Sequence, residues 1–139
     1  MTTKSHSHSH CLLCGDKNPW SLQLQFQADC NGEVTARFKG RYALQGYDGI
    51  LHGGVIASLL DSAMTNCLFQ QGINALTGEL RVRYRHPVPC NANLELRARV
   101  ATENRPLFVV ESELLKDHEV MAEATAKFME RPKDEQVKY

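Results

Sequence analysis

Gly46-Tyr-Asp-Gly-Ile-Leu-His-Gly-Gly-Val-Ile-Ala-Ser-Leu-Leu-Asp61 is the stretch of this 139-residue chain that determines its predicted fold. It begins as a glycine-rich loop and continues, to about Gln70, with apolar residues spaced three and four apart. This spacing predicts a helix with a wide buried stripe. The stripe consists of Val55, Ile56, Leu59, Leu60, Ala63, Met64 and Cys67, so Cys67 is predicted to be a core residue.

The predicted helix carries a single charged side chain. Asp61 is the only Asp, Glu, Lys or Arg between Gly49 and Gly78. A lone carboxylate on a mostly buried helix is costly unless it is paired or serves a function. Two interpretations follow: a structural carboxylate satisfied by neighbouring hydroxyl or amide groups, or a catalytic one.

Alternating apolar and polar residues predict strands on both sides of this helix. Before it, residues 21–28 and 33–39 are two such runs, and the Asn31-Gly32 turn between them predicts a hairpin. After it come four more predicted strands, with Asp117-His118 as the tight turn between the last two: 77–86, 93–102, 107–115 and 119–130.

The short connections between these strands favour antiparallel pairing. One face of the sheet must be covered, and the helix is the only long apolar element that can cover it. The predicted fold class is therefore α+β, a hotdog fold in which a curved antiparallel β-sheet wraps around one long central helix. We expect a single domain over residues 11–130, a disordered tail rich in His and Ser over 1–10, and a charged tail over 131–139.

Charge and composition exclude several classes of partner. Lys and Arg number sixteen, as do Asp and Glu, so no net field favours nucleic acid or an anionic membrane. No apolar run reaches the ~18 residues that span a bilayer, and no secretory leader is evident. The five cysteines are an odd number that suits reduced thiols, so we expect a soluble cytoplasmic protein.

The start of the chain contains metal-binding residue types. Cys11 and Cys14, with His6, His8 and His10, include enough ligands for zinc. A second Cys/His pair at a conventional distance is missing, and histidines on a tail are poorly positioned ligands. We therefore predict no metal and no cofactor, and retain only weak candidate ligands: Cys11, Cys14 and His10.

The motif Gly-x-x-His-Gly-Gly-x-x-x-x-x-Leu-Asp at residues 49–61 resembles the helix motif of hotdog-fold acyl-CoA thioesterases of the phenylacetate-degradation (PaaI-like) type. The strand and proline at 77–88 are similar to the strand that follows that helix in the family, and Cys11-x-x-Cys14-Gly15 resembles the start of one bacterial branch. The resemblance covers nearly all of residues 11–130. Many members carry Asn six positions before the histidine, whereas this chain has Gly46, with Gln45 and Tyr47 as the candidates to replace it.

The resemblance implies hydrolysis of an acyl-CoA substrate. Thioester hydrolysis needs a nucleophile or an activated water, together with donors for the developing oxyanion. Free amides at the helix N-terminus, at Gly53 and Gly54, are suited to form an oxyanion hole. Asp61 acts either as nucleophile or as general base. His52 either polarises the carbonyl or fixes the loop.

Helix geometry implies that two subunits share each site. Gly54 and Asp61 are seven residues apart, roughly 10 Å along a helix, so one thioester carbon cannot reach both ends. Two antiparallel helices across a two-fold axis solve this, which predicts a homodimer with shared sites. The family adds a homotetramer, a dimer of dimers.

We predict seven substrate-binding positions around the catalytic residues: Gln45, Gly46, Tyr47, Thr65, Thr77, Arg81 and Arg83. The two threonines either position water or are structural. The arginines on this strand face and the next either meet the phosphates of coenzyme A or lie on a sheet surface paired with Glu79 and Glu95.

Two other functions fit the same fold. A hotdog dehydratase or hydratase uses a histidine with a carboxylate partner, which the double glycine followed by Asp61 fits less well. A non-catalytic acyl-CoA-binding module keeps the cleft without turnover, and Gly46 is the feature that favours it.

Overall fold

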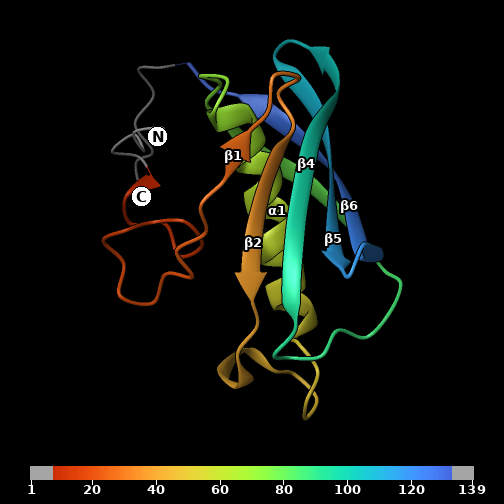
Figure 1. Ribbon diagram of the computed structural model, residues 1–139. Coiled ribbons are helices and arrows are strands. Elements are labelled where there is room, and N and C mark those ends of the chain that lie inside the picture. Colours follow the sequence, from red (N-terminus) through yellow and green to blue (C-terminus); the bar gives the residue numbers. More distant parts are fainter. Residues whose placement is uncertain (1–7, 133–139) are drawn as a thin grey trace.

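The computed structural model describes residues 8–132. Six strands form one antiparallel sheet in the order β1-β2-β4-β5-β6-β3, and the helix α1 lies against one of its faces (Figure 1). The predicted hotdog fold is therefore confirmed. The elements in chain order are β1 (Gln27–Ala28), β2 (Val34–Lys39), the 3-10 turn η2 (Tyr42–Leu44), α1 (Gly53–Phe69), β3 (Ala75–Tyr84), β4 (Asn93–Asn104), β5 (Leu107–Lys116) and β6 (Glu119–Glu130).

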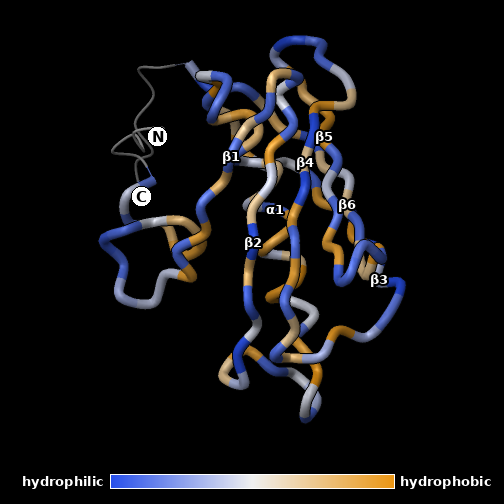
Figure 2. Tube along the Cα trace, in the orientation of Figure 1, coloured by the Kyte–Doolittle hydropathy of each residue, from blue (hydrophilic) through white to orange (hydrophobic). Residues whose placement is uncertain are grey.

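The core lies between α1 and the inner face of the sheet. Hydrophobic and hydrophilic residues alternate along the strands (Figure 2), and most of the hydrophobic ones are buried in the core. Small residues at Ala98 and Ala124 are buried on this face, which lets the helix approach the sheet closely. Cys67 is a core residue as predicted, and burial raises the pKa of its thiol to about 11, so the thiol stays protonated.

The predicted strand over 21–28 is wrong except at its end. Only Gln27–Ala28 pairs with β2. Leu24 and Phe26 are buried, as their alternation predicted, but Gln23 has a positive φ of 56°. The Leu22 and Leu24 N–H groups donate to carbonyls of the preceding loop rather than to a neighbouring strand. Burial thus follows the sequence pattern here, whereas the backbone pairing does not.

β3 lies at one edge of the sheet and contains an irregularity. It pairs only with β6, and its register shifts between Thr77 and Glu79, which leaves Gly78 as an extra, bulged residue. Because of this bulge, Thr77 and Leu80 both lie on the helix side of the sheet. The outer edge of β3 has no partner strand among the residues that the structure describes.

The turn between β5 and β6 and the tails can also be compared with the predictions. Asp117 and His118 both have positive φ, 49° and 68°, and form the predicted tight turn between β5 and β6. Within residues 8–132, no helix combines the length and apolar character needed to cross a bilayer. The predicted tails, 1–10 and 131–139, fall largely outside the described residues, but residues 8–10 form a turn.

Candidate active site

Asp61 lies in the middle of α1, half-buried on the side that faces β3. The Thr77 hydroxyl donates a hydrogen bond of 2.7 Å to Asp61 Oδ1. Burial raises the pKa of Asp61 from its ordinary value of 3.8, and the hydrogen bond from Thr77 opposes that rise. Asp61 is therefore a more basic carboxylate than an exposed aspartate, and its orientation is fixed by Thr77.

His52 is the N-cap of α1. Its Nδ1 accepts a hydrogen bond of 2.8 Å from the Gly54 N–H. Of the two alternatives for His52, this contact supports fixing of the loop, and it places the proton of a neutral ring on Nε2. The Gly54 amide, one of the two predicted oxyanion donors, is therefore already engaged within the chain.

The Gly53 amide is the remaining predicted donor at this helix end. Among residues 8–132, no acceptor contacts the Gly53 N–H. On its other side, the Gly53 carbonyl accepts a hydrogen bond of 2.7 Å from the Tyr84 hydroxyl. Tyr84 thus ties the start of α1 to the end of β3 and leaves the amide open.

A cavity of about 770 Å³ opens at this N-terminus of α1. Three of its lining residues, Gln45, Gly46 and Tyr47, belong to the predicted substrate-binding set. The others are Ile50, Leu51, His52, Gly53, Ile56, Tyr84, Arg85, His86, Pro87 and Val88. Asp61 does not line this cavity. It lies eight residues after Gly53, which corresponds to about 12 Å along the helix. One chain therefore holds the amide donor and the carboxylate apart.

The predicted loop residues differ in what they contact. Gln45 Oε1 accepts a hydrogen bond of 3.0 Å from the Gly49 N–H, so this side chain shapes the loop. A Cβ at Gly46 would lie 3.3 Å from the Cα of His52, which leaves little room for a side chain. Tyr47 is 86% exposed.

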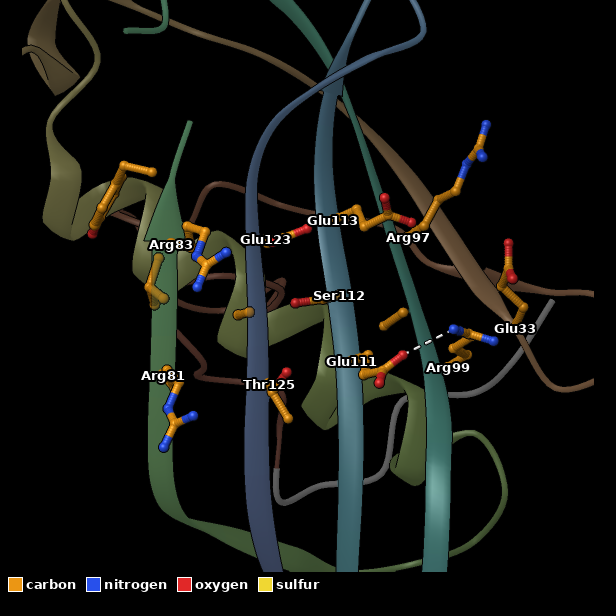
Figure 3. Close-up of a pocket in the computed structure, with 14 residues that line it drawn as sticks. Glu33, Arg81, Arg83, Arg97, Arg99, Glu111, Ser112, Glu113, Glu123 and Thr125 are labelled. Carbon is orange, nitrogen blue, oxygen red and sulfur yellow. Dashed lines mark hydrogen bonds and ion pairs between the residues drawn. The ribbon is translucent and has the colours of Figure 1, made fainter. Parts of the chain in front are cut away.

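Arg81 and Arg83 lie on the opposite face of the sheet from Asp61. Figure 3 shows them on β3 beside a second hollow, of about 860 Å³, with α1 behind the sheet. Acidic residues share this face, and the Arg99 guanidinium contacts Glu111 at 2.9 Å. Arg97 pairs with Glu95 at 3.4 Å, as the sheet-surface role expects, whereas Glu79 pairs with Lys127 at 3.9 Å instead of with an arginine. Contact of the arginines with coenzyme A phosphates stays a prediction.

Comparison with known proteins identifies the family. Residues 48–123, more than half of the chain, match the model of the Thioesterase superfamily. The chain belongs to this superfamily.

A curated relative, acyl-coenzyme A thioesterase THEM4 of Mus musculus, is 32% identical over 98 residues, which are 69% of this chain and 42% of the relative. The chain thus spans less than half of that relative. A putative thioesterase related to phenylacetic acid degradation, from Ralstonia eutropha, superposes with a TM-score of 0.71 at 24% identity over 78% of this chain and 85% of that one. The BH2602 protein of Bacillus halodurans, solved with CoA, gives 0.70 at 27% identity over 80% and 76%.

Sequence reasoning missed several residues of the superfamily fold that line the cavity. The sequence motifs do not mark Tyr84, His86 or Val88, which line the cavity. The signal for Tyr84 was present, since it shares a strand face with Leu80 and Val82. Thr65, a predicted substrate-binding residue, lies one helical turn after Asp61 and is half-buried.

The weak metal candidates are only partly brought together. Cys11 and Cys14 lie beside His8, with one ligand atom of each within 4.8 Å of the others. His10, the candidate named from the sequence, instead contacts the Ser9 hydroxyl through Nδ1 at 3.2 Å. The histidine of the cluster is therefore His8.

Proposed function

We propose that this chain is an acyl-CoA thioesterase, which hydrolyses a thioester to a free acid and coenzyme A. The observation that carries this proposal is Asp61, a half-buried carboxylate with a raised pKa that Thr77 orients. The relative from mouse is named an acyl-coenzyme A thioesterase, and the relative from Bacillus halodurans was solved with CoA.

Two routes use the same carboxylate. As nucleophile, Asp61 attacks the thioester carbon, the C–S bond breaks to release coenzyme A as a thiolate, and water then hydrolyses the mixed anhydride. As general base, Asp61 takes a proton from the water that attacks the same carbon. In both routes the oxyanion accepts a hydrogen bond from the Gly53 N–H at the positive end of the α1 dipole.

The active site requires a second copy of the chain. Leu80 and Tyr84, on the helix side of edge strand β3, are 38% and 52% exposed and lie on the same side as Asp61. A two-fold related copy packed on this surface, with the helices antiparallel, covers these apolar groups and brings its Asp61 to the cavity of the first. The proposed assembly is a homodimer with two shared sites, and pairing of dimers extends it to a tetramer.

The activity is tested by measuring thiol release from a panel of acyl-CoAs with the parent and Asp61→Asn. We expect turnover by the parent and a fall of at least ~100-fold in the variant. Binding of CoA, followed by calorimetry, should be retained in Asp61→Asn. Equal rates in the two proteins would eliminate Asp61 as the catalytic group.

The oxyanion donor is tested by Gly53→Pro, which removes the amide proton and adds a pyrrolidine ring. Proline suits the first residue of a helix, and His52 already has the extended conformation that precedes proline (φ −58°, ψ 132°). Gly53→Ala is the matched control, because its Cβ would lie 3.6 Å from the Tyr84 ring, an ordinary contact. We expect a loss of about 10²-fold in kcat for the proline variant and little change for the alanine variant.

Shared sites are tested by mixing the two inactive variants. If Asp61→Asn and Gly53→Pro subunits exchange, half of the dimers are mixed and each mixed dimer has one intact site. About a quarter of the parent turnover should return. No recovery after proven subunit exchange would place both groups in the same subunit's site.

A second candidate is an acyl-CoA-binding module without turnover. It is favoured by Gly46, which offers no amide side chain to the cavity and has little room for one. CoA binding with no thiol release across the panel would establish it. A dehydratase or hydratase is less well supported, because His52 Nδ1 contacts a backbone amide rather than a carboxylate.

A further inference from the structure

The loop that precedes β1 gathers three metal-binding side chains outside the candidate active site. They are His8, Cys11 and Cys14, and one ligand atom of each lies within 4.8 Å of the others. We propose that this cluster is a structural Zn²⁺ site, with two thiolates and one imidazole as protein ligands. Three protein ligands leave the fourth tetrahedral position to water or to a further side chain.

The spacing of the ligand atoms suits one ion. His8 Nδ1 and Cys14 Sγ are 3.6 Å apart. Zinc binds sulfur at about 2.3 Å and nitrogen at about 2.0–2.1 Å, so two such ligands at a tetrahedral angle lie about 3.6 Å apart. An ion placed between them needs only a small movement of Cys11, because all three atoms already lie within 4.8 Å.

The backbone holds these residues in a tight turn. The Cys11 N–H donates to the His8 carbonyl at 3.2 Å, and the Gly15 N–H donates to the Cys11 carbonyl at 2.8 Å. A Cβ at Gly15 would lie 2.5 Å from the Cys11 nitrogen, so the turn requires glycine at that position. The cluster is thus formed by the fold of the loop rather than by free side chains on a tail.

The backbone also positions the Cys11 sulfur. The Leu13 N–H donates a hydrogen bond of 3.4 Å to Cys11 Sγ. This contact holds the Cys11 sulfur within the turn, on the side of the other two ligand atoms. Neither cysteine forms a disulfide. Binding releases their two protons, and two thiolates neutralise the charge of the ion.

The position of the cluster indicates a structural role for a bound ion. Cys14 is buried in the main core, and the His8 ring packs on Phe69, at the end of α1, with centroids 4.6 Å apart. An ion that joins these residues fixes the leading loop to the C-terminal end of the helix. This end is opposite the cavity at Gly53, so the site stabilises the fold and does not take part in hydrolysis.

The test is metal analysis of protein purified without an added affinity tag. We expect about one zinc per chain, and Co²⁺ exchanged for zinc should give thiolate charge-transfer bands and strong visible bands of tetrahedral cobalt. The test variants are His8→Asn and Cys11→Ser, whose side chains are only half-buried. The matched controls are His10→Asn, two residues from His8, and Cys30→Ser, an exposed cysteine.

Zinc and the cobalt bands should be lost in both test variants and kept in both controls. A chelator should lower the melting temperature of the parent and leave that of Cys11→Ser unchanged. The proposal is overturned if Cys11→Ser keeps its zinc, if His10→Asn loses it as His8→Asn does, or if the parent binds no zinc when supplied with it. An isolated Cys11–Cys14 disulfide, seen by mass before and after reduction, would also overturn it.

Discussion

The two faces of the sheet hold ionisable groups under opposite conditions. On the helix side, one carboxylate, Asp61, is half-buried beside the hydroxyl of Thr77. On the outer face, arginines and glutamates are exposed and pair across strands, as Arg99 and Glu111 do at 2.9 Å. The charged groups on the outer face are hydrated and lie near opposite charges. Asp61 is partly removed from water, and this burial raises its pKa. The many charges of the outer face therefore say little about where the active site lies, whereas the isolated, half-buried carboxylate of Asp61 indicates it.

The largest expected effect comes from placing a charge on the helix side of β3. Leu80→Arg should prevent dimer formation, because an arginine would be buried against the second copy, and turnover should fall by at least ~100-fold. Leu76→Arg is the matched control, since Leu76 is also exposed on β3 but pairs with Met129 on the outer face. Light scattering after size exclusion gives the assembly. A dimeric, active Leu80→Arg would remove the proposed interface.

A smaller effect concerns stability as a function of pH. Because the folded-state pKa of Asp61 is raised above 3.8, the folded protein holds a proton that the unfolded chain releases, so stability decreases as pH rises through that window. Asp61→Asn has no such group. Its melting temperature should match the parent's below pH 3.8 and exceed it at neutral pH. Calorimetry across pH checks this, and a variant less stable at neutral pH would contradict it.

Activity should follow the same group. The proposed mechanism needs Asp61 ionised, so kcat should fall as pH decreases through its raised pKa. Thr77→Val removes the hydrogen bond that lowers this pKa, which should move the acid limb of the profile to higher pH. Thr125→Val, on the outer face of β6, is the control and should leave the profile unchanged. An unmoved profile in Thr77→Val would assign the acid limb to another group.

The smallest effect is expected on the outer face. Arg99 and Glu111 have side chains 68% and 41% exposed, and exposed pairs contribute about 0–1 kcal/mol. Arg99→Gln should therefore change the free energy of unfolding, measured in urea, by less than about 1 kcal/mol. The change should shrink further in salt. A loss of several kcal/mol would show that this face is covered by another chain.

The order and type of the elements followed from local periodicity, which is why the helix and the last four strands were predicted well. β6 has the predicted bounds, Glu119–Glu130, and α1 ends at Phe69, one residue before the expected end. The alternation of apolar and polar residues predicts which side chains are buried, however, and not which strand the backbone hydrogen-bonds to. Residues 21–28 alternate correctly, yet Leu22 and Leu24 hydrogen-bond to the leading loop.

The candidate site was predicted by residue type but not by contact. The Gly54 amide was expected to be free, and only the structure shows that His52 accepts its hydrogen bond. Arg81 and Arg83 were grouped with Asp61, although the sheet separates them. Simple alternation would also have placed Thr77 with those arginines, since all three have odd positions on one strand. Such contacts depend on the register between β3 and β6, which the sequence pattern of a single strand does not determine.

Gly78 explains that last discrepancy, and it affects how this chain should be compared with distant relatives. β3 contains one residue more than its pairing with β6 uses, and Gly78 is that residue. Removing it leaves a regular strand in which Thr77 and Leu80 keep their side of the sheet. Removing one residue further along would exchange the sides of Arg83 and Tyr84. An alignment should therefore allow a gap at Gly78 and refuse one between Leu80 and Tyr84.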